Sequence, residues 1–177
     1  MQYTSHYESP LGALTLASDG EALTGLWFDG QKHFAATLGR EHEGAALAVF
    51  AQTASWLDTY FGGAEPDFAP PVAPLGSDFR QAIWKIMRSI PFGQTTTYGQ
   101  IATRMAEEQG RGRVSAQAVG GAVAHNPILI IFPCHRVVGA QGSLTGYAGG
   151  IDKKTWLLEH EGTNMDGLFC PRRSTAP

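Results

Sequence analysis

A segment rich in proline and glycine, from Gly62 to Gly76, divides this chain of 177 residues into two parts. It contains four prolines and three glycines, which is typical of an extended linker. Each of the flanking parts is long enough to bury a core of its own. We therefore expect an N-terminal domain over residues 1–77, which includes the linker 62–76, and a C-terminal domain over residues 78–177.

The N-terminal part has the pattern of a small antiparallel sheet with one helix. Short runs rich in Thr, Leu and aromatic residues are separated by glycine and proline turns, which predicts strands over 3–8, 12–18 and 22–28. Apolar residues then recur at helical spacing from Ala45 to Phe61. The sequence therefore predicts a small α/β unit.

The two parts differ in charge. Residues 1–77 carry two basic and nine acidic side chains, whereas residues 78–177 carry eleven basic and seven acidic ones. A basic C-terminal part is compatible with a polyanionic partner, but so small an excess is weak evidence, and an ordinary solvated surface is the default explanation. The sequence contains no apolar run of membrane-spanning length and no secretory leader pattern. We expect a cytoplasmic monomer that does not contact a membrane.

The C-terminal part is predicted to be mainly helical. Apolar spacing predicts helices over 78–90, 98–106 and 115–125, the first capped by Asp78 and the last by Ser115. The last two would form a helix-turn-helix, a unit that often lays its second helix against DNA, although many other helix pairs share this pattern. The pair Gly120-Gly121 is unfavourable in a helix and suggests that another backbone approaches closely there.

A cysteine and a histidine follow the most apolar run of this part. The uncharged run 128–132 predicts a short buried strand that ends at Pro133. Cys134, His135 and Arg136 follow at once, and a neighbouring His or Arg can lower the pKa of a thiol. Cys134 is therefore a candidate nucleophile, although many free cysteines are only buried packing residues.

The rest of the chain supplies a loop, a helix and a tail. Five glycines between Gly139 and Gly150 leave room for a pocket-forming loop, and Asp152 can cap a last helix through His160. A basic turn is expected over 110–113, and the tail after residue 171 is expected to fray.

Several segments between residues 78 and 162 resemble, in order and spacing, the O6-alkylguanine-DNA alkyltransferases (methylated-DNA-protein-cysteine methyltransferases). The segments are IPFGQTTTYGQIA (90–102), AVGGAVAHNP (118–127), PCHRV (133–137), GSLTGYAGG (142–150) and WLLEHEG (156–162). The resemblance implies a single-turnover DNA repair protein that moves an alkyl group from O6-alkylguanine in DNA to its own cysteine. By the same resemblance, the protein needs no cofactor. Its expected partner is alkylated DNA, which is either a duplex bound through the minor groove or single-stranded.

The resemblance also implies roles for single residues. Cys134 is the nucleophile, His135 acts on it through a bridging water, and Glu161 orients His135. Tyr98 helps rotate the nucleotide out of the stack and donates toward the departing guanine. Asn126 ties the recognition helix to the active-site turn.

The base pocket and the DNA contacts follow from the same resemblance. Tyr147 is expected to line the pocket, with backbone groups of Cys134, Val137 and Ala148 holding the guanine. The DNA contacts are expected to come from the recognition helix, the tyrosine that opens the preceding helix and the arginine after the Cys-His pair: Ser115, Gln117, Ala118, Gly121, Tyr98 and Arg136.

The recognition helix departs from the family at one position. Gln117 stands where the alkyltransferases place an arginine that fills the space left by the flipped base. Glutamine can offer hydrogen bonds but lacks the charge and the planar fork of a guanidinium. We estimate that the replacement makes the free energy of binding to flipped DNA less favourable by about 1–3 kcal/mol, the scale of one stacking or bidentate contact.

Three alternatives remain open on the sequence alone. The first is a lesion-binding relative that recruits repair proteins without transferring, although such proteins typically lack the cysteine. The second is an unrelated cysteine hydrolase, whose local motifs are absent. The third is a metal site at Cys134, His135 and Cys170, which lacks the usual ligand spacing. The N-terminal part has no cysteine, so the zinc site that some family members carry there is not expected.

Overall fold

The computed structural model describes residues 1–110 and 112–171. The tail from residue 172 and part of the basic turn 110–113 lie outside the described residues. Within the described ranges no helix is long and apolar enough to cross a membrane.

The N-terminal sheet matches the predicted strands. β1 (Gln2–Ser9), β2 (Gly12–Ser18) and β3 (Leu23–Phe28) form consecutive antiparallel pairs. A fourth strand, β4 (His42–Gly44), pairs in parallel with β1 and gives the order β3-β2-β1-β4. β4 is not predicted from the sequence because it is short and wholly exposed and so has no alternating pattern.

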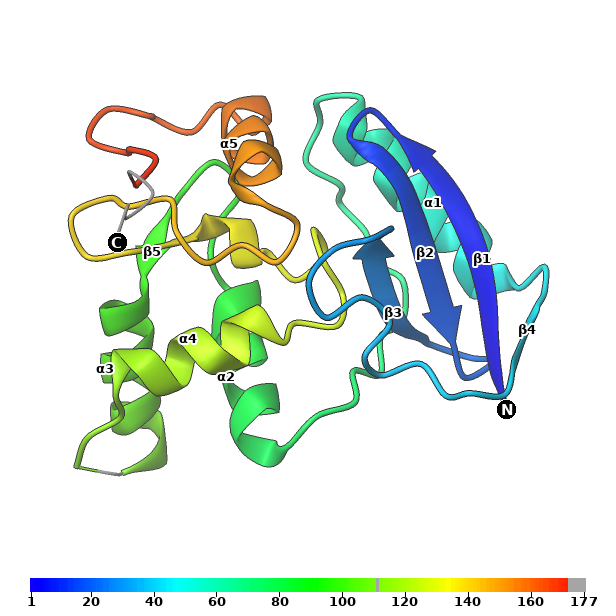
Figure 1. Cartoon of the computed structure of the whole chain (residues 1–177), viewed down its shortest axis with the longest axis horizontal. Helices are drawn as coiled ribbons and strands as arrows, with labels where there is room; N and C mark the ends of the chain where they lie inside the picture. The colour runs from blue at the N-terminus through cyan, green and yellow to red at the C-terminus, as the bar shows by residue number, and fades with distance from the viewer. Residues whose placement is uncertain (111, 172–177) are drawn as a thin grey trace, which may run out of the picture.

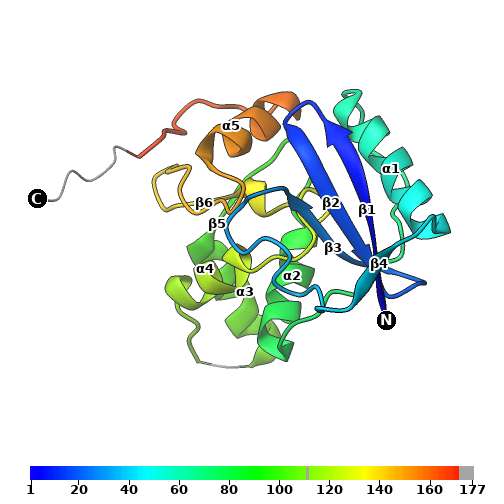
Figure 2. The same cartoon turned by 45° about the vertical axis from the view of Figure 1, so that its right-hand side comes forward.

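Helix α1 (Ala48–Phe61) covers one face of this sheet (Figures 1 and 2). It begins later than the predicted Ala45, after Leu47, which makes no side-chain cap. Its buried side chains pack toward the sheet and toward the rest of the molecule: Val49, Phe50, Thr53, Trp56, Leu57 and Tyr60.

The segment 62–76 is extended, as predicted, but it is also packed. Leu23 N–H donates to the carbonyl of Pro71, and Ala73 N–H donates to the carbonyl of Leu23, both over 2.8 Å. Val72 thereby forms a parallel bridge beside β3. One hydrophobic cluster continues from the sheet into the C-terminal helices, so the two parts of the chain share a core.

The described residues of the C-terminal part form four α-helices: α2 (Asp78–Arg88), α3 (Tyr98–Gln109), α4 (Ala116–Ala124) and α5 (Ile151–His160). Ser115 caps α4 as predicted. Two predicted caps were wrong: α2 is capped by Ser77 rather than Asp78, and α5 follows Gly150 without a side-chain cap, with Asp152 in its first turn. In each case the aspartate lies one or two positions inside the helix, where its charge still favours the positive end of the helix dipole.

Helix α3 is longer than predicted and has a cap that the sequence analysis did not identify. Thr97 and Gln100 form a capping box, in which each side chain accepts a hydrogen bond from the backbone N–H of the other. The helix continues past Ala106 to Gln109, where Gly110 ends it in the left-handed conformation. This cap fixes the position of Tyr98, the first residue of α3.

The predicted strand over 128–132 is wrong. Ile128 forms only an isolated bridge to Leu26, and Phe132 N–H returns to the carbonyl of Ile128 over 3.0 Å. Ile130 has a φ of 69°, which no β-strand accommodates. The run is apolar because a tight loop packs into the core, with Ile131 alone partly exposed, a context that hydrophobicity alone cannot separate from a strand.

Candidate active site

The predicted nucleophile lies at the start of a short 3-10 helix, Cys134–Arg136, directly after the buried loop. Cys134 N–H donates to the carbonyl of Phe132 over 2.8 Å, and the residue is 4% exposed. The turn leads into β6 (Val137–Val138), which pairs in parallel with β5 (Thr96–Thr97) just before α3. Cys134 is therefore held on both sides by backbone pairing.

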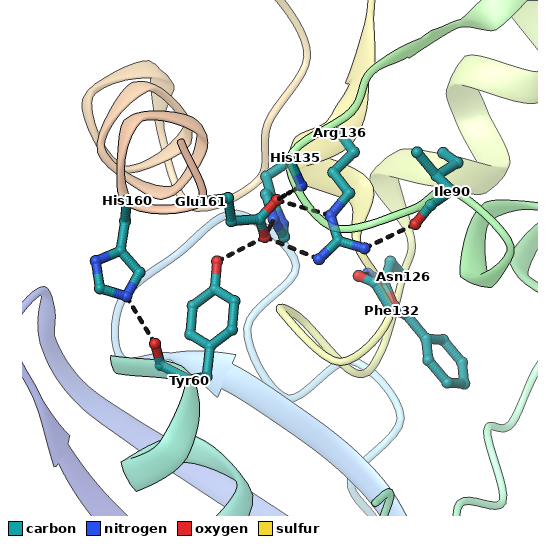
Figure 3. A network of polar contacts seen from close by, with 9 residues as sticks. Tyr60, Ile90, Asn126, Phe132, His135, Arg136, His160 and Glu161 are labelled. Atoms are coloured by element: carbon teal, nitrogen blue, oxygen red, sulfur yellow. Dashed lines mark hydrogen bonds and ion pairs between the residues drawn. The ribbon is translucent and has the colours of Figure 1, made fainter. Parts of the chain in front are cut away.

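Glu161, at the end of α5, organises the polar groups behind the cysteine (Figure 3). Its Oε1 accepts from His135 Nε2 over 2.6 Å, from the Tyr60 hydroxyl over 2.8 Å and from Arg136 Nη2 over 2.9 Å. Its Oε2 accepts from Arg136 Nε over 2.9 Å and from Gly93 N–H over 3.1 Å. Burial raises the pKa of Glu161, but the hydrogen bonds from His135 and Arg136 outweigh it and hold the pKa well below its ordinary value. Glu161 is therefore a carboxylate at neutral pH.

His135 is a neutral imidazole in this arrangement. It is completely buried, and burial lowers its pKa although Glu161 opposes the effect. A carboxylate can only accept, so Nε2 carries the proton that points at Glu161. Nδ1 is then the nitrogen with the free lone pair, and it has no hydrogen-bond partner among the described residues. His135 thus combines a fixed orientation with a basic nitrogen that is not engaged by Glu161.

Arg136 does not lie where a DNA contact was expected. Its Nη1 donates to the carbonyl of Ile90 over 2.8 Å, its other nitrogens bind Glu161, and it is 9% exposed. The guanidinium is committed to the interior, where it balances the charge of Glu161. A guanidinium in a Cys-His-Arg sequence is as well suited to a buried carboxylate as to a phosphate, so the sequence alone could not distinguish the two.

Asn126 links the end of α4 to the cysteine turn. Its Nδ2 donates to the carbonyl of Phe132 over 2.8 Å (Figure 3). Its Oδ1 accepts from Ile128 N–H over 3.0 Å. Both ends of the buried loop are thereby tied to one side chain, which is the connection expected of this residue.

The structure adds a lysine that the sequence analysis missed. Lys154 is completely buried, and its Nζ donates to the carbonyls of Val137 and Thr145. Burial lowers the pKa of Lys154 to about 8, although the nearby Cys134 opposes the shift. Its spacing from Leu157 and Leu158 puts it on the apolar face of α5, and that spacing was the available signal.

The thiol itself is protonated at rest. Burial raises the pKa of Cys134 to about 11, although Asn126, Lys154 and backbone N–H groups act in the opposite direction. Desolvation of the anion therefore outweighs the polar groups that would favour it. Reaction at Cys134 requires that a base remove the proton as the new bond forms.

Two tyrosines border the approach to the cysteine. The Tyr98 hydroxyl donates to the carbonyl of Thr145 over 3.2 Å, and burial, followed by the charge of Cys134, raises its pKa to about 12. Tyr147 is 7% exposed, its ring centroid lies 6.5 Å from that of His135, and burial raises its pKa. Ala148, in the same loop, accepts a backbone hydrogen bond from Lys32 N–H over 3.2 Å. The loop is thus held by both parts of the chain.

A largely apolar groove of about 440 Å³ runs outside Tyr98, between the start of α3, α4 and the loop at Thr145 and Gly146. This volume is within the usual range for ligand sites. The predicted DNA-contact positions on α4 are all exposed: Ser115, Gln117, Ala118 and Gly121. Gly120 and Gly121 were expected to admit the close approach of another backbone, and none among the described residues comes near them: a Cβ at Gly120 would touch only Tyr98, at 4.0 Å, and one at Gly121 would touch nothing within 4 Å. The small residues instead leave a smooth outer face.

The described residues contain no group of three His, Cys, Asp or Glu side chains that could hold a metal ion. Cys134 and Cys170 are both free thiols, the first buried and the second exposed.

The chain matches two family descriptions that together span most of its length. Residues 2–74 match "6-O-methylguanine DNA methyltransferase, ribonuclease-like domain", and residues 78–163 match "6-O-methylguanine DNA methyltransferase, DNA binding domain".

Curated relatives and solved structures agree with these matches. A methylated-DNA--protein-cysteine methyltransferase of Haemophilus influenzae is 39% identical over 90% of this chain and 86% of its own length. One of Mycobacterium bovis is 42% identical over 88% of this chain and 92% of its own. The crystal structure of Mycobacterium tuberculosis OGT in complex with DNA superposes with a TM-score of 0.77 at 42% identity, covering 90% of this chain and 92% of that one.

Proposed function

This chain belongs to the family of 6-O-methylguanine DNA methyltransferases, and on that premise we propose that it repairs DNA by transferring an alkyl group from O6-alkylguanine to its own Cys134. The product is a thioether, which has no hydrolytic route back to the thiol in this site. Each molecule therefore acts once, as a methylated-DNA-protein-cysteine methyltransferase.

The observation that carries this proposal is the arrangement of Cys134, His135 and Glu161. Glu161 fixes the proton of His135 on Nε2 and leaves Nδ1 free to accept, in the residue next to a buried thiol. The proton of Cys134 passes to Nδ1, through a bridging water, as Sγ attacks the alkyl carbon. A positioned base of this kind contributes typically about 10²- to 10⁴-fold to a rate.

The proposed transfer is a single nucleophilic displacement at the alkyl carbon. The Sγ–C bond forms while the C–O6 bond breaks, and the electron pair of that bond leaves on the guanine. Guanine gains a proton as the thiol loses one, so the net exchange is the alkyl group for a hydrogen. The Tyr98 hydroxyl, at the mouth of the site, donates to the Thr145 carbonyl in this structure and would turn toward the leaving base as its hydrogen-bond donor, since its raised pKa keeps it protonated at neutral pH.

The base is held by the loop on one side and the cysteine turn on the other. Tyr147 supplies an apolar wall, and the backbone of Cys134, Val137 and Ala148 supplies the polar contacts. Lys154 supports this pocket because its ammonium joins the carbonyls of Val137 and Thr145. Asn126 holds the cysteine turn in place through Phe132 and Ile128.

DNA binding is assigned to the exposed face of α4 with the groove beside Tyr98. Ser115, Ala118 and Gly121 have small side chains, which suit a helix that enters the narrow minor groove. Gln117 lies in the first turn of α4 and takes the place of the family's arginine. We propose that this replacement weakens engagement of flipped duplex DNA by roughly 5- to 150-fold, the equivalent of one stacking or bidentate contact, and leaves the thiol chemistry unchanged.

The test is intact-mass measurement after incubation with DNA that contains O6-methylguanine. The mass should rise once, by one CH₂ unit, and peptide mapping should locate the change at Cys134. The matched controls are Cys134→Ala, which should not react, and Cys170→Ala, which should react like the wild type. Lesion binding without any mass change would instead identify a non-transferring damage sensor, and a methyl group on Cys170 would refute Cys134 as the nucleophile.

A further inference from the structure

The N-terminal helix α1 reaches the active site through one side chain, Tyr60. Tyr60 is completely buried, and its hydroxyl donates to Glu161 Oε1 across a separation of 101 residues. The same oxygen accepts the proton of His135 Nε2 (Figure 3). Building on the alkyl transfer proposed above, we propose that Tyr60 is a positioning residue supplied by the N-terminal domain. It holds Glu161 in place and sets how strongly this carboxylate polarises His135.

The hydroxyl of Tyr60 is not needed for packing. The ring stacks on Trp56 with centroids 5.4 Å apart and meets Phe61 and Phe92 edge-on at 5.4 and 6.1 Å. A phenylalanine would make the same contacts. A buried hydroxyl is costly unless it is hydrogen-bonded, and this one is bonded to the carboxylate that orients the base.

A second bond joins the same two helices. His160 Nε2 donates to the carbonyl of Tyr60 over 2.7 Å, and the His160 ring stacks on Trp156 at 4.6 Å. His160 precedes Glu161 in the chain, so Tyr60 fixes two consecutive residues at the end of α5, one through its hydroxyl and one through its carbonyl. The N-terminal part thereby holds Glu161 in register with His135.

The direction of the electrostatic effect follows from the charges around the pair. Glu161 is faced by Tyr60 of α1, by Gly93 N–H and by His135 and Arg136 of the cysteine turn. His135 is also close to Cys134, to Tyr147 of the loop and to Lys154 of α5. All of these partners except the Tyr60 hydroxyl itself remain when that hydroxyl is removed.

Without the Tyr60 hydroxyl, Oε1 carries more negative charge toward His135 Nε2–H. The protonated imidazole is then favoured, and the pKa of His135 rises. His135 must be neutral to accept the proton of Cys134, so the acid limb of the pH–rate profile moves to higher pH. We expect a shift of roughly 0.5 to 1 pH unit, which is about 3- to 10-fold in rate on that limb.

The experiment measures the rate of Cys134 alkylation by free O6-benzylguanine from mildly acidic to mildly alkaline pH, using the full chain. Tyr60→Phe should move the acid limb upward. Tyr7→Phe is the matched control, because Tyr7 donates its hydroxyl over 2.6 Å to Asp58, also on α1 but away from the site. It should leave the profile unchanged. Thermal unfolding of both variants establishes that they are folded at each pH.

A second variant covers the case in which Tyr60→Phe does not fold. Site-specific 3,5-difluorotyrosine at position 60 keeps the hydroxyl and makes it a stronger donor, so the acid limb should move to lower pH. An unshifted limb in both Tyr60 variants would overturn the role of Tyr60 while wild-type alkylation of Cys134 still supported the transfer function. No alkylation of the wild type would overturn both.

Discussion

Replacing Glu161 by glutamine tests the centre of the proposed site. The carboxylate accepts five hydrogen bonds, from His135, Tyr60, Gly93 and two nitrogens of Arg136. Glutamine has one acceptor oxygen, and its amide group would turn two donors toward groups that also donate. Glu161→Gln therefore leaves a buried guanidinium without its counter-charge and His135 without its orienting acceptor.

The expected cost is large because both partners are buried. Removing one member of a buried ion pair typically destabilises a protein by about 3–5 kcal/mol. A domain of ordinary stability has about 5–15 kcal/mol in total, so the variant should lose a large fraction of its free energy of unfolding. Alkyl transfer should slow by roughly 10- to 10⁴-fold, the range for loss of general-base assistance, while DNA affinity should stay nearly the same.

Urea unfolding at neutral pH measures the stability, and quenched-flow transfer with binding titration separates chemistry from affinity. The matched control is Glu159→Gln, an exposed glutamate on the same helix, which should change neither stability nor rate. Wild-type transfer rates in Glu161→Gln would refute the relay. An unchanged unfolding midpoint would refute the structural role of the carboxylate.

The stability that the Glu161 carboxylate contributes depends on pH. The folded-state pKa of Glu161 lies below its unfolded value, which is near 4.3. Its contribution to stability is therefore fully present above that unfolded value and is lost as the pH falls through the lower folded pKa. The stability gap between the wild type and Glu161→Gln should be constant around neutrality and should narrow only in strong acid.

Three further predictions address the edges of the site. Gln117→Arg should accelerate transfer from duplex DNA by roughly 5- to 150-fold without changing the reaction with free O6-benzylguanine, and Gln109→Arg controls for the added charge; equal acceleration on both substrates would place the defect in the chemistry. Gly146→Ala should impair transfer because Gly146 has a φ of 83° and an added Cβ would lie 2.6 Å from the Tyr98 hydroxyl. The control is Gly63→Ala, which should lower stability alone because Gly63 has a φ of 97° and nothing lies within 4 Å of an added Cβ. Equal transfer rates in the two variants would refute the contact with Tyr98. Iodoacetamide should label the exposed Cys170 before the buried Cys134. A pKa of about 11 lowers the thiolate fraction of Cys134 about 100-fold relative to a thiol of pKa 9. Early labelling of Cys134 at neutral pH would contradict a protonated resting thiol.

Local chemistry explains which elements the sequence predicted well. The strands β1 to β3 are bounded by glycine turns and have clear runs of strand-forming residues, and Ser115 caps α4 through its own side chain. The buried loop 128–132 has the composition of a strand, but its conformation is set by Asn126 at its ends and by the core around it. Composition could not reveal that. The motif resemblance identified Cys134, His135 and Glu161 together, whereas Tyr60 lies in a segment that carried little of the resemblance and no spacing rule connects it to Glu161.

The burial that makes the site hard to read from sequence also governs its chemistry. A thiol whose pKa is raised to about 11 is a poor nucleophile toward small electrophiles, and its 4% exposure keeps them away. The proposed base, His135, is equally buried and is kept neutral, with its orientation fixed by Glu161, which Arg136 and Tyr60 hold in turn. A single-turnover protein loses its function with any stray modification of its cysteine. We infer that a buried, protonated Cys134 beside a fixed base reacts only with an alkyl group that is bound between the cysteine turn and the loop of Tyr147. There, deprotonation of the thiol and displacement at the alkyl carbon occur together.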